Sequence, residues 1–495
     1  MPSRQQVLWI GDKPDKAVEE AFVQRRLSLT QIVNPTDDDL SVSRAAIFNI
    51  TRYSGAIAGQ LSSELPRCIS HGARPIIRCD STTGLIIQAR FSEFKDRYGL
   101  IGSLMPPDDL AEEAREGIQG AGPTFNKTLK VKGATLTGEN LLLLQRAFSD
   151  CSEIELLPLT EGKSNALVFR AHARVGSVAP AAFMLPFLVK LDTAPNIETE
   201  LENFRTYVAP HVPFSHRPDL DAGRSLIGAT RGILVGDFVE DAASLAQLCS
   251  DPSGRGAIYS LFDDALRSWR RHAYADPSTT KLSFTELMPG LIKETEILPR
   301  IVNLARKKFG LTATPNQLVD RLTKASVFNY RRGIIHGDLH PGNVMVRGSE
   351  PILIDFFSIW GAAPLIADVA CMEVAVCFTI APEKTALGRT KVHEKPFRSW
   401  KKEIDALFAK ACLNYVPPLQ EPPSEFNWLW SICRQTRMMA HLVGADRGPY
   451  EAALVAYLLR RARLGLNPKE NLLIAAYALR TAEVVLKCLE ARTKK

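Results

Sequence analysis

The most informative segment of the chain reads Gly333-Ile-Ile-His336-Gly-Asp338-Leu-His340-Pro-Gly-Asn343-Val-Met-Val346, and Pro351-Ile-Leu-Ile-Asp355-Phe356 follows after a turn. Two apolar, strand-like runs carry acidic or amide side chains at their ends. Asp338 and Asn343 are five residues apart, and Asp355 lies seventeen residues beyond Asp338. Mg²⁺ binds hard oxygen ligands, often together with substrate phosphates, and an Asn and an Asp from adjacent segments provide such oxygens. Since a further Asp can orient or deprotonate a hydroxyl group, the pattern predicts phosphoryl transfer.

The segment resembles the catalytic loop and metal-binding strand of the aminoglycoside phosphotransferase and choline-kinase branch of the protein-kinase-like superfamily. The run His336-Gly-Asp-Leu-His-Pro-Gly-Asn343 parallels the HxDxxxxN loop of that branch, and Ile354-Asp-Phe356 stands where protein kinases have Asp-Phe-Gly. The resemblance implies an α+β bilobal fold with a helical C-lobe, and ATP and Mg²⁺ as cofactors. It implies that Asp338 is catalytic and that Asn343 and Asp355 bind the metal.

A kinase-like fold requires an N-lobe upstream, which we expect over residues 137–240, with the C-lobe over residues 241–495. Thr160-Glu-Gly-Lys-Ser-Asn165 lies between two strand-like runs and resembles the nucleotide loop of aminoglycoside kinases. Backbone N–H groups and small side chains approach phosphates in such loops. Three residues are therefore expected to contact the nucleotide: Gly162, Ser164 and Asn165. The stretch Asp237-Phe-Val239 is expected to be the hinge whose backbone meets the adenine.

Lys190 ends an apolar, strand-like run, where a charge is costly unless it is paired. It is placed like the third-strand lysine of kinases, so the resemblance implies that Lys190 contacts the ATP phosphates. One glutamate of the following helix should pair with it, and the candidates are Glu198, Glu200 and Glu202. Glu200 is preferred because it lies four residues before Phe204, as in the family's Glu-x-x-x-aromatic register.

Asp368 lies in Ala363-Pro-Leu-Ile-Ala-Asp368-Val-Ala, a segment that resembles the family's Gly-x-x-x-x-Asp-Leu-Ala. In that family this Asp braces the catalytic loop, so the resemblance implies a supporting role rather than a chemical one. His336 and His340 are expected to stabilise the geometry of the loop, since neither has the i, i+4 partner of a helical metal site.

Residues 1–118 alternate strand-like and helix-like segments, which predicts βαβ units around a parallel sheet. The pattern resembles a response-regulator receiver domain, an α/β flavodoxin-like fold. Receivers carry metal-binding acids at the position of Asp12, a phosphoacceptor Asp at that of Asn49 and a Lys at that of Met105. Without the last two groups, a phosphoryl-transfer site lacks its acceptor and its charge partner. We therefore expect a degenerate receiver that docks a protein partner, followed by a flexible linker over residues 119–136.

The basic charge of the chain is concentrated in its C-terminal part. Residues 381–495 hold 20 Lys and Arg against 11 Asp and Glu, whereas the net charge of the whole chain is +7. A basic C-lobe argues against a free cationic acceptor. The cluster Arg460-Arg461-Ala-Arg463 faces either an anionic partner or solvent, and both interpretations stay open. Nucleic-acid binding ranks last, because no aromatic residues interleave with the basic ones.

The composition is that of an ordinary globular protein, with 45% hydrophobic and 23% charged residues among 495. No apolar run reaches the roughly 20 residues of a membrane helix, and the first residues lack a signal-peptide core. The nine cysteines are scattered without a CxxC pair, so neither a disulfide framework nor a zinc site is expected. We expect a cytoplasmic protein that does not enter a membrane.

These residues together predict an ATP- and Mg²⁺-dependent phosphotransferase that moves the γ-phosphate to a hydroxyl of an unidentified small molecule or protein. The alternative is a nucleotide-binding, pseudokinase-like scaffold that acts through the receiver-like domain. A kinase-like domain joined to a receiver-like module resembles the ternary-complex-associated domains of bacterial signalling and conflict systems. That resemblance implies a role in signalling or defence.

Overall fold

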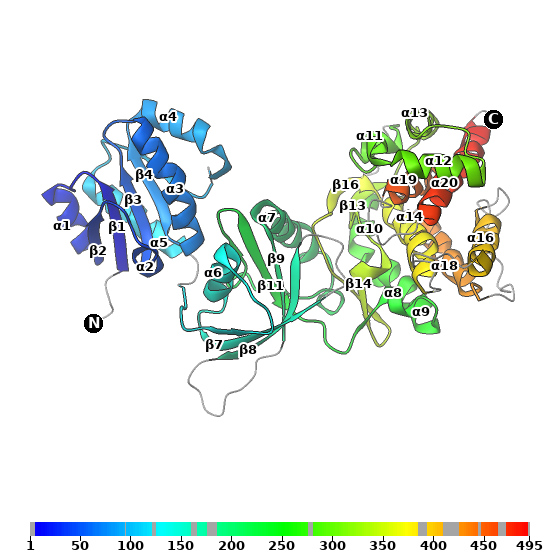
Figure 1. Cartoon of the computed structure of the whole chain (residues 1–495), viewed down its shortest axis with the longest axis horizontal. Helices are drawn as coiled ribbons and strands as arrows, with labels where there is room; N and C mark the ends of the chain where they lie inside the picture. The colour runs from blue at the N-terminus through cyan, green and yellow to red at the C-terminus, as the bar shows by residue number, and fades with distance from the viewer. Residues whose placement is uncertain are drawn as a thin grey trace. The chain divides into compact units, whose positions relative to one another are not determined.

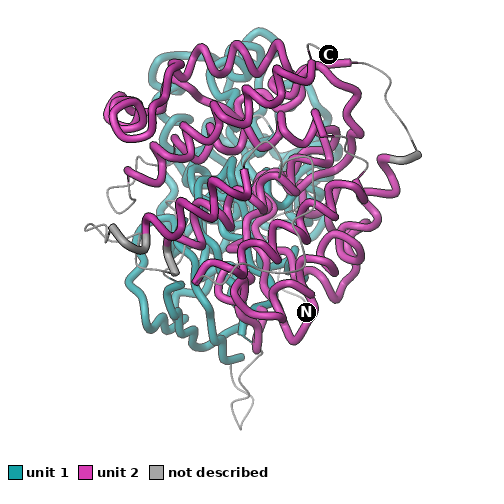
Figure 2. Tube along the Cα trace, turned by 90° about the vertical axis from the view of Figure 1, so that its right-hand side faces the viewer, with its two compact units in different colours: residues 1–201, 219–238 teal, residues 202–218, 239–495 magenta. Residues whose placement is uncertain are grey.

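The computed structural model describes most of the chain, namely residues 5–94, 96–120, 125–159, 166–175, 186–275, 281–384, 394–408, 425–443, 447–463 and 472–493. The chain divides into two compact units (Figure 2). Unit 1 comprises Met1–Leu201 and Asp219–Phe238, and unit 2 comprises Glu202–Pro218 and Val239–Lys495. The domain limits expected from the sequence divide the chain more finely and remain predictions.

The first part of unit 1 is a five-stranded parallel sheet with helices packed along it (Figure 1). The strand order is β2-β1-β3-β4-β5, the order of doubly wound flavodoxin-like sheets. The strands are β1 (Gln5–Gly11), β2 (Leu27–Ile32), β3 (Ser43–Asn49), β4 (Arg74–Cys79) and β5 (Gly99–Gly102). The helices are α1 (Lys16–Gln24), α2 (Asp37–Val42), α3 (Gly55–His71), α4 (Ser81–Arg90) and α5 (Pro107–Gly120). The expected alternation of strands and helices is confirmed, and the receiver identity remains a prediction.

Alternate residues of β1 show that both faces of this sheet are buried. Leu8 and Ile10 enter one buried cluster, whereas Val7 and Trp9 enter a separate cluster. Successive strand side chains point to opposite faces, so a strand that is buried on both faces reads as one continuous apolar run. In sheets of this kind, the carboxyl ends of the strands are the usual place for a ligand.

A second sheet in unit 1 has six strands in the order β10-β11-β9-β8-β7-β6. Its strands are β6 (Lys130–Lys132), β7 (Cys151–Pro158), β8 (Leu167–Val175), β9 (Phe187–Thr193), β10 (Leu226–Ile227) and β11 (Arg231–Asp237), with helices α6 (Gly138–Ala147) and α7 (Ala194–Asn203). Within β9, Lys190 lies opposite Val168 of β8 and Leu234 of β11. Helix α7 begins where β9 ends, and its Ile197 and Leu201 pack against Leu234. Helix α7 is therefore held against the sheet at β11, the strand that pairs with β9 at Lys190.

The segment expected to be a flexible linker, residues 119–136, contributes to this second sheet. Strand β6 pairs in parallel with β7, with Val131 opposite Ile154. Leu129 and Leu136 are buried in the same core. Leu129 and Val131 are apolar at a spacing of two, which places both side chains on one face of a short strand. This alternation is short and lies among Lys, Gly and Thr residues, which are typical of linkers. The sequence therefore suggested a flexible linker where the structure has strand β6.

Polar side chains connect the two sheets of unit 1. The buried guanidinium of Arg146 on α6 donates to the carbonyl oxygen of Ser70 at 2.7 Å. The Glu139 carboxylate accepts from the Ser70 hydroxyl at 2.5 Å and from the backbone N–H of Ala229 at 2.5 Å. Arg97 donates to the carbonyl oxygen of Gly228 at 2.6 Å. Buried polar groups that all find partners fix one arrangement of the surfaces they join.

Unit 2 is mostly helical, with two small sheets. The sheets have the order β12-β14-β15 and the pair β13-β16. The strands are β12 (Ala243–Ser244), β13 (Arg332–Ile335), β14 (Val344–Arg347), β15 (Glu350–Leu353) and β16 (Trp360–Pro364). The helices are α8 (Leu245–Leu248), α9 (Pro252–Ser260), α10 (Arg267–Ala275), α11 (Phe284–Leu287), α12 (Pro299–Phe309), α13 (Pro315–Ala325), α14 (Ile366–Ala375), α15 (Ala381–Lys384), α16 (Glu394–Leu407), α18 (Trp428–Leu442), α19 (Arg447–Arg463) and α20 (Leu472–Thr493).

The C-terminal helices form the core of unit 2. Helices α19 and α20 pack on each other, and α19 also packs on α14. Residues 366–374 of α14 are all buried. Helices are expected for this part of the chain, and α19 and α20 are two of those the structure shows. Among the described residues, no helix is long and apolar enough to cross a membrane, and every described cysteine is a buried thiol outside any disulfide.

Candidate active site

The hairpin formed by β14 and β15 brings two of the expected metal ligands to the same place in unit 2. Val344 pairs with Leu353 in antiparallel register. The N–H of Ile354 donates to the carbonyl oxygen of Asn343 at 3.1 Å, which extends the ladder by one step. Asn343 precedes the first strand and Asp355 follows the second, so both lie at one end of the hairpin.

The loop before the hairpin holds the Asn343 amide in a defined orientation. Its Nδ2 group donates to the carbonyl oxygen of Asp338 at 3.0 Å. The backbone N–H of His340 donates to the same oxygen at 2.8 Å, and the N–H of Gly342 donates to His340 Nδ1 at 3.0 Å. The bond from Asn343 uses its N–H group and not its oxygen, and an amide oxygen is a hard ligand for Mg²⁺. His340 stabilises the loop, as expected.

Asp355 has a backbone conformation that is uncommon for a residue other than glycine. Its φ of +63° lies in the left-handed region, and among the described non-glycine residues only Arg26 and Asp241 share this feature. Such a conformation costs of order 1 kcal/mol or more and persists only where the surroundings hold it, often at functional sites. Phe356, the next residue, is fixed by a hydrogen bond, because Asn203 Nδ2 donates to its carbonyl oxygen at 2.9 Å.

Asp368 braces the loop of residues 336–343, as expected of a supporting residue. Its Oδ2 accepts from the backbone N–H of His336 at 2.8 Å, and its Oδ1 accepts from that of Gly337 at 3.0 Å. Gly337 has a φ of +76°, and a Cβ there would lie 2.0 Å from the carbonyl oxygen of Ser358, so only glycine fits. The His336 ring contacts the carbonyl oxygen of Ile354 at 3.0 Å, which ties the loop to the hairpin.

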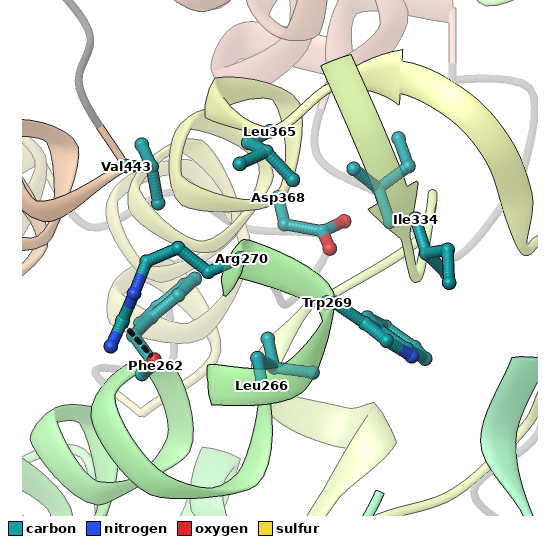
Figure 3. Close-up of a pocket in the computed structure, with 9 residues that line it drawn as sticks. Phe262, Leu266, Trp269, Arg270, Ile334, Leu365, Asp368 and Val443 are labelled. Atoms are coloured by element: carbon teal, nitrogen blue, oxygen red, sulfur yellow. Dashed lines mark hydrogen bonds between the residues drawn. The ribbon is translucent and has the colours of Figure 1, made fainter. Parts of the chain in front are cut away.

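The environment of Asp368 suits a support rather than a ligand site. Figure 3 shows its carboxylate among apolar side chains, which include Leu266, Trp269, Ile334 and Leu365. Burial raises the pKa of Asp368 to about 6. The adjoining cavity has a volume of about 20 Å³, which is room for about one water molecule.

In unit 1, Lys190 forms an ion pair with one of the three candidate glutamates. Its Nζ lies 2.8 Å from Glu200 Oε2, and the two side chains are 14% and 5% exposed. Glu198 points elsewhere, because its carboxylate pairs with Arg97 at 3.2 Å. Glu202 is exposed. A largely buried cation needs such a counter-charge, so α7 determines where the Lys190 ammonium lies.

The remaining expected nucleotide contacts are less defined. Gly162, Ser164 and Asn165 lie outside the described residues. Asp237 ends β11, and burial raises its pKa, with the nearby Asp219 adding to the shift. Val239 begins the main segment of unit 2. The hinge and the nucleotide loop therefore stay predictions.

The arginines of α19, Arg460, Arg461 and Arg463, do not form a face turned to solvent, which was one of the two interpretations of this cluster. Each of the three side chains contacts an acceptor of this chain. Arg461 Nε donates to the carbonyl oxygen of Phe378 at 3.0 Å, and Arg463 Nε lies 3.4 Å from Glu296 Oε2. Arg460 Nη2 lies 3.0 Å from Oδ1 of Asp338. Helix α19 is buried around most of its circumference, so protein covers the larger part of each of these cations.

Sequence reasoning gave Arg460 no link to the candidate site. The two partners are far apart in the sequence, so no local spacing connects Arg460 with Asp338. One signal was present, because Arg460 follows the continuous apolar run Leu454–Leu459. A cation inside a helix that is apolar on all sides must find a buried partner.

The oxygen groups at the hairpin end suit a shared Mg²⁺ rather than a closed protein cage. Among the described residues, no group of three or more His, Cys, Asp or Glu could hold a metal. Mg²⁺ usually takes one or two protein oxygens and completes its shell with substrate phosphates and water. The Asn343 amide oxygen and the Asp355 carboxylate form a donor set of that kind.

Comparison with known proteins gives one family match and several structural likenesses. Residues 310–394 match the family described as ternary complex associated domain 9, and this span includes the loop of residues 336–343, the hairpin and α14. The match covers much less than half of the chain. No curated protein is significantly similar to the chain.

Three solved structures illustrate the structural likenesses. The aminoglycoside phosphotransferase APH(4)-Ia with ADP and hygromycin B is 14% identical, with a TM-score of 0.40 over 69% of this chain and 95% of that one. An amicoumacin kinase with AMP-PNP and Ca²⁺ is 12% identical, with a TM-score of 0.39 over 67% and 88%. A choline/ethanolamine kinase family protein from Mesorhizobium loti is 12% identical, with a TM-score of 0.35 over 68% and 92%.

Proposed function

We propose that this chain is an ATP- and Mg²⁺-dependent phosphotransferase that transfers the γ-phosphoryl group to a hydroxyl of a small molecule or protein. The observation that carries the proposal is the hairpin end, where Asn343 and the strained Asp355 lie together. The loop that holds Asp338 is bonded to Asn343 and braced by Asp368. A turn that served only to connect two strands would need neither the strain nor the brace.

Each residue has a role that follows from its chemistry. Asn343 and Asp355 would supply oxygen ligands to Mg²⁺, and the Lys190 ammonium would hold nucleotide phosphates while Glu200 orients it. Bound ATP would supply the γ-phosphoryl group, and the Mg²⁺ ion would place positive charge beside it. Asp338 would orient the acceptor hydroxyl and take its proton. The acceptor oxygen would then form its bond to the γ-phosphorus as the bond to the β,γ-bridging oxygen broke, with ADP as the leaving group.

Calorimetry with the non-hydrolysable analogue AMP-PNP tests the metal part of this proposal. The wild type should bind the analogue more tightly with Mg²⁺ than with EDTA, and Asn343→Ala should lose most of that difference. Glu350→Gln is the matched control, because Glu350 is exposed at the opposite end of the same hairpin. Equal metal dependence in the wild type and Asn343→Ala would contradict the assignment.

The alternative, a nucleotide-binding scaffold, is favoured by one specific observation. The Arg460 guanidinium lies against the carboxylate of Asp338, the group proposed to receive the proton. A scaffold of this kind would bind Mg²⁺-ATP and leave it intact with every acceptor. Under either function, we propose that the domain of residues 5–120 is a degenerate receiver that docks a partner, because Arg78 donates to Asn49 Oδ1 at the expected acceptor position.

A further inference from the structure

The guanidinium of Arg460 lies beside the proposed catalytic carboxylate and is only partly covered. Its Nη2 is 3.0 Å from Asp338 Oδ1, and the two side chains are 20% and 31% exposed. Its Nη1 donates to the carbonyl oxygen of Gly337 at 3.4 Å, and its guanidinium carbon lies 5.8 Å from the ring centre of Tyr457. Both partners therefore remain accessible to a small molecule.

These contacts leave part of the guanidinium unused. A guanidinium has five N–H donors in a planar fork, and the contacts with Asp338 and Gly337 take two of them. Within the described part of the chain, no other residue accepts from Arg460. A planar fork with donors to spare matches the two oxygens of a carboxylate or phosphate.

The charge around Arg460 favours an anion over a cation. The neighbouring arginines of α19 are already engaged, Arg461 by Phe378 and Arg463 by Glu296. In the described part of the chain, Arg460 forms an ion pair with one acid, Asp338. This contact uses the Oδ1 atom of Asp338 and not its Oδ2 atom. A cationic acceptor that brought its hydroxyl to Asp338 would meet a fixed positive charge a few ångströms away.

We propose that Arg460 is a specificity residue that binds an anionic group of the acceptor, a carboxylate or a phosphate, while Asp338 receives the acceptor hydroxyl. The proposal rests on the phosphotransferase function above and names its substrate class as hydroxylated acids or phosphate esters. The Oδ1 contact holds the carboxylate of Asp338 in place and leaves Oδ2 to the hydroxyl. The anionic group and the hydroxyl of the acceptor must then lie within a few bonds of each other.

Three probes with one carbon skeleton test this proposal, namely glycerol, D-glycerate and glycerol 3-phosphate. Each is titrated against the full chain saturated with Mg²⁺ and AMP-PNP, so that phosphate sites of the nucleotide are filled. We expect at least one anion to bind at least about tenfold more tightly than glycerol. Binding of glycerate alone identifies a carboxylate acceptor, and binding of glycerol 3-phosphate alone identifies a phosphate ester.

Variants of α19 and of the loop assign the effect to Arg460. Arg460→Gln should abolish the preference for the anion, and Arg460→Lys should retain only part of it, because the ammonium lacks the fork. Arg463→Gln is the matched control one turn away and should bind like the wild type. Asp338→Asn should tighten anion binding, since it removes the carboxylate that competes for Arg460. A residue that served only to support the fold would not show this gain.

The outcomes separate this inference from the proposed function. If AMP-PNP does not bind in a Mg²⁺-dependent way, the phosphotransferase proposal fails. If it binds, and the anions bind no better than glycerol, then the inference about Arg460 is overturned. An anion preference that survives unchanged in both Arg460 variants overturns it as well. Circular dichroism of each variant identifies a folding defect, and Arg460→Lys keeps the charge if Arg460→Gln does not fold.

Discussion

Two regions of this protein place polar side chains at the ends of strands, and they treat those side chains in opposite ways. In the first sheet, Arg78 donates to Asn49 Oδ1 at 3.2 Å and to the carbonyl oxygen of Ser103 at 2.7 Å. The hydroxyl of Thr51 donates to Asp12 Oδ2 at 3.1 Å. The oxygens that could hold a metal or a phosphoryl group there accept bonds from their own neighbours.

The hairpin of unit 2 uses its polar groups differently. Asn343 bonds to the loop through its N–H group, and Asp355 is held in a left-handed conformation. Asp368 is buried behind the loop only to accept two backbone N–H groups. The comparison teaches that a site is recognised by how the polar groups are held, and not by the presence of acids at strand ends.

The largest effect expected from this contrast is on phosphoryl transfer. Asp338→Ala should reduce ADP formation by about 10²- to 10⁴-fold, because the acceptor hydroxyl loses the group that takes its proton. The affinity for Mg²⁺-ATP should change by less than about threefold. Asp12→Ala, at the corresponding place in the first sheet, should leave the rate unchanged. A coupled ADP assay measures both, and near-normal turnover of Asp338→Ala would remove Asp338 from the mechanism.

The next effect concerns the Lys190–Glu200 pair. Glu200→Gln leaves the largely buried Lys190 without its counter-charge, so the ammonium is no longer held in one place. We expect turnover to fall by about 10- to 100-fold. The matched control is Glu202→Gln on the same helix, which is exposed and should behave as the wild type. Equal losses in both variants would show that α7 is merely sensitive to substitution.

A stability effect of about 3 kcal/mol is expected at Asp368. Its pKa is about 6 in the folded chain against 3.8 ordinarily, because burial disfavours the charged form. Between about pH 4 and pH 6 the unfolded chain releases this proton while the folded chain keeps it, so the free energy of unfolding falls as the pH rises. Asp368→Asn cannot titrate. Urea unfolding from pH 4 to pH 7 should therefore show the wild type losing about 3 kcal/mol relative to the variant, and parallel pH profiles would contradict this.

A smaller effect is expected where the first sheet meets α7. Arg97 pairs with Glu198, two residues from Glu200 on the same helix, and also bonds to the carbonyl oxygen of Gly228. Arg97→Ala frees one side of α7 without touching Lys190, so turnover should fall by only about two- to fivefold. Arg115→Ala is the control, since Arg115 pairs with Glu112 inside the first domain. A loss as large as that of Glu200→Gln would mean that the contact governs the whole helix.

The smallest effect is expected from restoring an acid to the first sheet. Asn49→Asp places a carboxylate beside Arg78, where an ion pair would form in place of the present hydrogen bond. Mass spectrometry after incubation with acetyl phosphate should show no phosphorylation, because Met105 provides no charge partner. A phosphorylated Asp at this position would show that the domain has kept receiver chemistry and would weaken the contrast.

Local patterns in the sequence were sufficient for much of the molecule. The alternation of strand-like and helix-like segments over residues 1–118 predicted the parallel sheet, and the polar side chains of the loop and hairpin were found by their spacing together with a resemblance to a kinase catalytic loop. The brace by Asp368 followed from a motif and is present as two hydrogen bonds. Such features depend on residues close in the chain, or on a spacing that two strands enforce.

Features set by distant contacts could not be read in the same way. Strand β6 has only one apolar residue between two lysines, and its place follows from pairing with β7. The pairing of Arg460 with Asp338 depends on how α19 packs against α14, which no local spacing encodes. The left-handed conformation of Asp355 is one that Asp residues adopt only in a minority of cases, so the residue type alone does not predict it.

Mass spectrometry of the purified protein with Mg²⁺-ATP tests whether the hairpin end supports metal-dependent phosphoryl transfer. The wild type, the wild type with EDTA, and Asp355→Ala are incubated in parallel, and ADP, free phosphate and phosphorylated protein are measured. ADP should form with the wild type and Mg²⁺ and drop to background with EDTA and with Asp355→Ala. Equal ADP formation by the wild type and Asp355→Ala, or ADP formation that EDTA does not reduce, would contradict the assignment of the metal site and with it the phosphotransferase.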